Sequence, residues 1–191
     1  MADTTVSTKV LLRDIRLSYF NGWHATAIDE KSDKKYSTAI LIPKDNAKNV
    51  DAFKEVMDAL VAEAKAKNKG KLPPKFKLPL RDGDEEKPDD ENYAGMYFIN
   101  ANSTTKPGIV GKEKDENGKP KPITDESQVY SGCYAHVTVN LFLYEAKGNV
   151  GIGCGLNNIM KTKDGAPLAG KSSAAEDFAE IEDDSEEENY L

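Results

Sequence analysis

The 191-residue sequence predicts a mainly β fold, in which five or six strands form a small OB-fold-like barrel with one helix. Three observations support this prediction. Several segments alternate apolar and polar side chains, as half-buried strands do. Only residues 50–67 repeat apolar side chains at spacings of three and four, which indicates an amphipathic helix. Residues 71–91 and 103–128 are rich in proline, glycine and charge, which favours loops.

Three strands are expected before the helix, over residues 8–20, 23–29 and 36–43. The Asn21-Gly22 pair predicts a two-residue hairpin turn between the first two strands, because such turns need residues that tolerate positive φ. Asn49 is the expected N-cap of the helix and Gly70 its stop. Three more strands are expected over residues 94–100, 133–146 and 150–161. This order, β-β-β-α-β-β-β, is close to that of an OB-fold, a barrel that binds oligonucleotides on one face.

Charge is distributed unevenly along the chain. The net charge is −7, yet residues 176–191 hold nine acids and no Lys or Arg, so residues 1–175 carry about +2. A second acidic run, 82–91, has seven acids and one lysine, which leaves the rest of the body near +8. A segment as acidic as residues 176–191 cannot bury enough apolar surface to fold. We therefore expect one barrel domain over 1–171 and a disordered acidic tail over 172–191.

The tail ends on a hydrophobic pair that follows its acids. We expect it either to lie on a basic groove as an intramolecular competitor or to dock on a partner protein. A purely solubilising role is the alternative. The residues concerned are Glu182, Asp183, Asp184, Glu186, Glu187, Glu188, Tyr190 and Leu191.

Several function classes fit this sequence poorly. No apolar run approaches the ~18 residues of a membrane span, and no signal-peptide pattern opens the chain. Cys133 and Cys154 are too few for a disulfide scaffold, and we expect both as inert thiols inside the barrel. His24 and His136 lack metal-ligand spacing. We therefore expect a soluble intracellular protein that is not an enzyme and binds no metal or cofactor.

Residues 133–146 form the most informative predicted strand. One of its faces is wholly apolar and suits a barrel interior. The other interleaves aromatic and polar side chains, and unpaired bases stack on such rings for about 1–3 kcal/mol each. Burial of this face under a loop or the helix is the alternative. The candidate DNA contacts on it are Tyr134, His136, Phe142 and Tyr144.

Basic residues cluster just after the predicted helix, with seven Lys or Arg over 65–81. A basic arm of this kind neutralises phosphates and releases counterions, whereas a solvated helix end and loop explains the cluster equally well. The candidate contacts here are Lys75, Phe76 and Lys77, with Lys106 in the second loop and Tyr36 in the third strand as extensions of the surface.

The last predicted strand carries glycine at positions 151, 153 and 155 of one face. Glycine inside a strand marks sharp curvature or the close approach of another backbone. We favour closure of the barrel as the reason, with a bound ligand as the alternative.

A set of motifs in residues 131–170 resembles a known family, phage single-stranded-DNA-binding proteins of the Enc type from enterobacterial phage. The matching motifs are Ser131-Gly132-Cys133-Tyr134, Gly151-Ile152-Gly153, Gly155-Leu156-Asn157-Asn158, Asp164-Gly165, Pro167-Leu168 and Gly170. Residues 10–20 and 39–43 are similar too. The resemblance implies an OB-fold with an acidic C-terminus.

The same resemblance implies a function. It points to a non-enzymatic protein of the host cell cytoplasm that coats single-stranded DNA in phage replication or recombination, largely independently of sequence. The tail would then recruit replication or recombination proteins, and self-association is left open. A protein-interaction scaffold or virion component is the alternative, and it predicts no DNA affinity. An RNA-binding module is a third hypothesis, and it predicts a preference for RNA through 2′-hydroxyl contacts.

Overall fold

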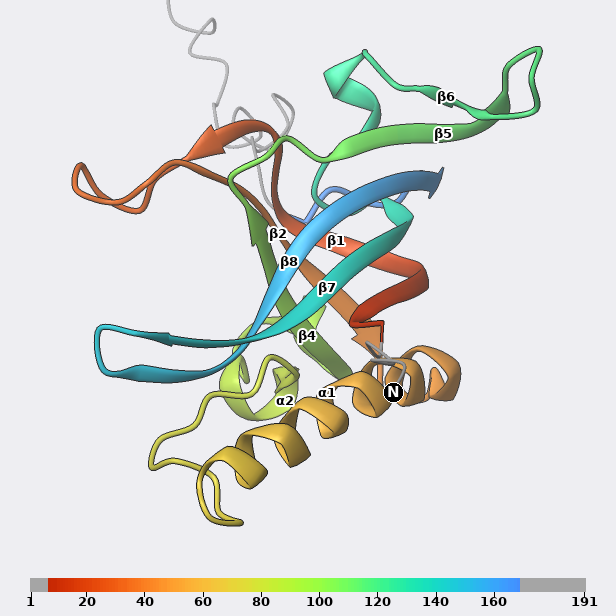
Figure 1. Cartoon of the computed structure of the whole chain (residues 1–191). Helices are drawn as coiled ribbons and strands as arrows, with labels where there is room; N and C mark the ends of the chain where they lie inside the picture. The colour runs from red at the N-terminus through yellow and green to blue at the C-terminus, as the bar shows by residue number, and fades with distance from the viewer. Residues whose placement is uncertain (1–6, 169–191) are drawn as a thin grey trace, which may run out of the picture.

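The computed structural model describes residues 7–168, and its centre is a closed barrel of five strands (Figure 1). Antiparallel pairing runs in the order β4–β2–β1–β7–β8, and a parallel contact between Asn102 and Gly155 joins β4 to β8 and closes the ring. This is the predicted OB-fold. The barrel strands are β1 (Lys9–Thr26), β2 (Lys35–Pro43), β4 (Met96–Ser103), β7 (Tyr134–Ala146) and β8 (Asn149–Lys163).

Alternate apolar side chains of the strands fill the barrel interior. On β7, Val137, Val139 and Leu141 are at most 1% exposed, which confirms the predicted inward face of this strand. Helix α1 (Ala47–Lys67) lies across one end of the barrel, where its Phe53 is fully buried (Figure 1). The amphipathic stripe that predicted the helix is thus the face that closes the core.

The helix begins earlier than its predicted N-cap. The side chain of Asn46 accepts a hydrogen bond from the backbone N–H of Asn49, 3.2 Å away, so Asn46 is the cap. Asn49 instead lies buried inside the first turn. Its side chain exchanges two hydrogen bonds with the backbone of Arg13 and so fixes the helix to β1.

The predicted hairpin at Asn21-Gly22 is wrong. Strand β1 continues through this pair to Thr26, and the chain reverses only between Thr26 and Lys35. A Cβ on Gly22 would lie 2.4 Å from the ring of Phe20, so glycine is needed here for packing within a bulged strand. One strand, β1, therefore replaces the two predicted over residues 8–20 and 23–29, and the helix follows the second strand instead of the third.

Both predicted loops contain short elements. The first holds β3 (Arg81–Asp82), helix α2 (Gly83–Glu86) and the 3-10 turn η1 (Glu91–Tyr93). The second holds a hairpin of β5 (Gly108–Lys114) and β6 (Pro120–Pro122), which projects from the barrel, and the 3-10 turn η2 (Glu126–Gln128) (Figure 1). Reading residues 103–128 as loop was wrong because β5 extends the sheet by pairing with β8, a distant partner.

The predicted domain boundary at 171/172 and every predicted tail contact lie outside the described residues. Within residues 7–168, no helix combines the length and apolar character that crossing a membrane requires.

Candidate nucleic-acid interface

A groove crosses the outside of the barrel over β2, β4, β7 and β8. It consists of two hollows of about 400 Å³ each, which share Lys35 and Asn102. The β1–β2 loop, the β7–β8 hairpin and the segment 77–81 form its walls. In an OB-fold, the face of the second and third strands and the loops beside it are the usual nucleic-acid surface. Here the second and third barrel strands are β2 and β4, so the groove lies on that surface.

The floor of the groove carries the small and amide side chains of Ser37, Asn100 and Asn102, and strand register extends this row across the sheet. Strand register aligns Asn140 with Gly155, Gly155 with Asn102, and Asn102 with Ser37, so one outward row crosses four strands. A Cβ on Gly155 would meet no atom closer than 3.6 Å. The space above Gly155 is therefore open, and packing within the barrel does not require glycine there.

Phe142 stands at the edge of this floor. Its side chain is 48% exposed, and Tyr144 lies two residues further along the same strand and lines the same groove. A Cβ on Gly153 would lie 2.5 Å from the Phe142 ring, so this glycine lets the ring rest against β8. An aromatic side chain held in this way offers a stacking surface to an unpaired base.

The predicted basic arm is fixed to β8 through its backbone. The N–H of Lys77 donates to the carbonyl of Val150 and the carbonyl of Lys77 accepts from the N–H of Ile152, each at 2.9 Å. A Cβ on Gly151 would lie 2.5 Å from that Lys77 carbonyl, which explains the glycine. The side chain of Lys77 thereby lies at the groove, whereas Phe76 packs partly buried against the core.

Positive charge dominates the groove walls. Lys31, Lys35, Lys77 and Lys147 line the groove, and none of them forms an ion pair with another residue of the range 7–168. Unpaired cations along one groove attract an anionic backbone and lower the cost of bringing phosphates close together. Arg81 also lines the groove, but Glu86 pairs with its guanidinium at 2.9 Å.

The other end of β7 has different surroundings. Lys163 and Arg16 lie 4.4 and 5.6 Å from the centre of the Tyr134 ring, and Arg16 also donates hydrogen bonds to the carbonyls of Gly132 and Ala166. His136 accepts a hydrogen bond from a backbone N–H through Nδ1. These contacts tie the strand to the rest of the barrel.

Three further predicted contacts also lie outside the groove lining. The ammonium of Lys106 lies 5.6 Å from the ring centre of Trp23. Tyr36 is in register with Ser103, on the opposite sheet face from the Ser37–Asn102 pair. Lys75 is exposed in a turn with φ of 58°. Of the sequence-predicted contacts, the structure thus brings together Phe142, Tyr144 and Lys77.

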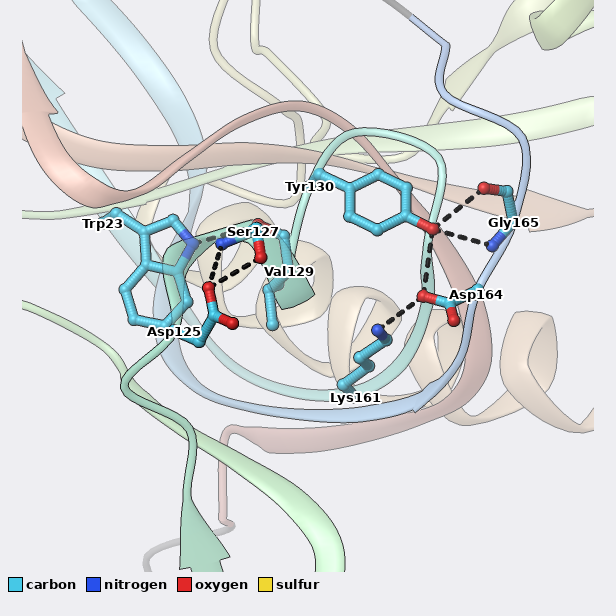
Figure 2. Close-up of polar contacts among 8 residues, drawn as sticks. All are labelled: Trp23, Asp125, Ser127, Val129, Tyr130, Lys161, Asp164 and Gly165. Atoms are coloured by element: carbon cyan, nitrogen blue, oxygen red, sulfur yellow. Dashed lines mark hydrogen bonds and ion pairs between the residues drawn. The ribbon is translucent and has the colours of Figure 1, made fainter.

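Internal hydrogen bonds hold the chain where it leaves β8 (Figure 2). The hydroxyl of Tyr130 lies 3.1 Å from a carboxylate oxygen of Asp164 and accepts a hydrogen bond from the N–H of Gly165. The ammonium of Lys161 lies 2.6 Å from the same Asp164 oxygen, and these two bonds lower the pKa of that carboxyl. The Asp164-Gly165 motif is thus explained by local structure.

The two cysteines are buried free thiols. Burial raises the pKa of Cys133, and raises that of Cys154 to about 12, so both are protonated at neutral pH. Among residues 7–168 no cluster of three or more His, Cys, Asp or Glu side chains is arranged to hold a metal ion.

The sequence-based prediction missed several residues of the groove. Lys35 begins β2 directly after the β1–β2 loop, and Lys147 lies in the β7–β8 turn. Their position at turns of the predicted barrel was a signal that could have identified them. Asn102 and Gly155 meet only through the β4–β8 contact, for which the sequence carries no local signal.

Comparison with known proteins supports this description of the fold. A model of the family described as "Enterobacter phage Enc34, ssDNA-binding protein" matches residues 8–190. Putative protein p50 of Acyrthosiphon pisum secondary endosymbiont phage 1 is 28% identical over 190 residues, which cover 94% of this chain and 97% of that protein.

Solved structures show the same architecture. The single-stranded DNA-binding protein from bacteriophage Enc34 in complex with ssDNA is similar with a TM-score of 0.67 at 23% identity, over 85% of this chain and 90% of that one. For gp2.5, a single-stranded DNA-binding protein encoded by bacteriophage T7, the values are 0.53 and 14%, over 96% and 99%. From the match over residues 8–190, this chain belongs to the Enc34 family of phage single-stranded-DNA-binding proteins.

Proposed function

We propose that this protein binds single-stranded DNA in the groove, largely independently of sequence, and coats and protects it during phage DNA replication or recombination. One observation carries the proposal: four lysines that form no ion pair within residues 7–168 share a groove with an exposed aromatic ring. The lysines attract phosphates, and their binding releases counterions. Phe142 supplies a face on which any base can stack.

The groove floor favours unpaired bases. Asn100 and Asn102 line it with exposed amide side chains, and each amide offers both donors and an acceptor. Such groups bond the edges of any of the four bases, provided that those edges are not already occupied in a duplex. This supports binding of single strands without a marked sequence preference.

The acidic tail completes the proposal. Its charge is opposite to that of the groove lysines, which supports a role in modulating access to the groove and in recruiting replication or recombination proteins. The protein acts without catalysis in this scheme, since DNA binding alone accounts for the groove.

The proposal is tested by titrating labelled oligo-dT with the full-length protein between about 50 and 200 mM salt. We expect saturable binding that weakens steeply with salt and exceeds binding to duplex DNA. Stronger binding to oligo-rU would favour the RNA-binding module. No binding to either oligonucleotide at low salt would favour the scaffold or virion component.

A charge-matched pair of double variants locates the binding site. Replacing Lys35 and Lys77 with Gln should make the negative slope of log K against log salt shallower by about 1.4, because each phosphate contact on a single strand contributes about 0.7 to its steepness. Replacing Lys48 and Lys163 with Gln removes the same charge outside the groove lining. In this control variant the salt dependence of binding should stay close to that of the unchanged protein. Equal losses would place the site elsewhere.

A further inference from the structure

Unlike the groove lysines, Arg81 forms an ion pair within residues 7–168. Its Nε and Nη2 donate to the two carboxylate oxygens of Glu86, both at 2.9 Å, so the fork of the guanidinium meets the fork of the carboxylate. The ring of the buried Phe98 lies under the guanidinium, 4.9 Å away. Arg81 is therefore positioned from below by an aromatic ring and from the side by an acid.

Arg81 also lies where two hollows meet. It lines the groove together with Phe142, and it lines the adjoining hollow of about 690 Å³, which is also lined by the acids Asp82, Glu85 and Glu86 and by Lys54 and Lys77. The basic groove thus continues into a hollow that carries both lysines and acids. A DNA strand that follows the lysines reaches Arg81 at this end.

A phosphate presents the same pair of oxygens to an arginine fork as a carboxylate does. We propose that Arg81 is a phosphate contact of the groove and that Glu86 occupies its guanidinium as an internal substitute for phosphate until DNA displaces it. This inference rests on the proposed function. Both side chains are about 40% exposed, at 44% and 39%, so solvent screens their attraction and the exchange is easily reached.

The anchoring of α2 keeps Glu86 in place. Lys44 contacts carboxylate oxygens of Asp82 and Asp84, each at 2.7 Å, at the start of this short helix. Glu86 is the last residue of the same helix. The acid that competes with phosphate is therefore held by the fold and does not depend on the tail.

The test compares two isosteric variants of the full chain. Glu86→Gln frees Arg81 and should tighten binding to oligo-dT by about 1.4- to fivefold at low salt, which corresponds to the range measured for exposed ion pairs. The gain should shrink as the salt concentration rises, because screening weakens the competing Arg81–Glu86 ion pair of the unchanged protein. Glu85→Gln is the matched control. It removes the same charge from the same hollow, but Glu85 forms no ion pair among the described residues.

A second variant makes the test specific. In an Arg81→Gln background, Glu86→Gln should have no more effect than Glu85→Gln, and thermal melting checks that every variant folds. Equal effects of Glu86→Gln and Glu85→Gln in the otherwise unchanged chain would overturn the inference while leaving DNA binding intact. Absence of oligo-dT binding by the unchanged protein would instead overturn the proposed function.

Discussion

The two ends of β7 both present aromatic and polar side chains outward, in different surroundings. Phe142 and Tyr144 border a groove whose lysines have no ion-pair partner in the described part of the chain. Tyr134 and His136 lie some eight residues back along the strand, about 26 Å away at 3.3 Å per residue. There the ring contacts two cations and the imidazole accepts a backbone hydrogen bond.

The residues directly across on β8 explain this difference. Phe142 is paired with Gly153, which has no side chain, whereas Tyr134 is paired with Lys163, whose ammonium lies over the ring. Cross-strand neighbours interact as units of a sheet. An outward aromatic residue is therefore open to a ligand only if its partner strand leaves room beside it.

Removing the aromatic ring at either end of β7 should have very different effects on DNA binding, and the loss should be largest at Phe142. Phe142→Ala should weaken oligo-dT binding by about fivefold or more, because stacking contributes about 1–3 kcal/mol per base. Tyr134→Ala should change affinity less than about twofold and lower the melting temperature instead, since cation–π contacts contribute about 0.5–1 kcal/mol. Fluorescence titration and thermal melting separate the two effects. Equal losses of affinity would mean that both ends of β7 bind DNA.

Filling the groove floor should have the next largest effect. Gly155→Leu should cost about tenfold in affinity by displacing one stacked base. It should leave the melting temperature nearly unchanged, because no atom lies closer than 3.6 Å to a new Cβ and the rest of the side chain would extend away from the outer sheet face. Gly151→Ala is the contrasting variant: its Cβ would lie 2.5 Å from the Lys77 carbonyl, so we expect about 1–3 kcal/mol of destabilisation. Unchanged affinity of Gly155→Leu would remove this row from the site.

Neutralising the tail should sharpen the comparison further. We consider a full-length variant in which the six acids at 182–184 and 186–188 are replaced by Asn or Gln. It should bind oligo-dT several-fold tighter than the unchanged protein at low salt. This gain should be lost at ~1 M salt, where the screening length falls to about 3 Å. The gain should shrink in the Lys35→Gln, Lys77→Gln background. A gain of equal size there would show that the tail does not compete for the groove.

The smallest effect is expected at His136. His136→Ala removes the acceptor for the N–H of Asp14 and should cost about 1 kcal/mol of stability. Affinity for oligo-dT should stay within about twofold of that of the unchanged protein, because His136 is not among the residues that line the groove. Titration and denaturant unfolding of the same sample measure both quantities. A clear loss of affinity would extend the site along β7.

Much of the barrel was predictable because its signals are local. The alternation in residues 133–146 identified the inward side chains of β7, and the stripe of α1 identified the face that covers the core. The Asn21-Gly22 signal misled because the same glycine that suits a turn also suits a bulge against Phe20. Deciding between the two requires knowing which strand β1 pairs with.

The class of the protein follows from local sequence patterns: a β barrel with one helix, a basic body, an acidic C-terminus and an outward row of aromatic residues on β7. Which of those residues share a surface depends on how the strands pair in three dimensions. The groove depends on the β4–β8 contact, on Lys77 reaching β8, and on the pairing of Phe142 with glycine. These are contacts between residues far apart in the chain, and spacing along one strand carries no information about the neighbour across it.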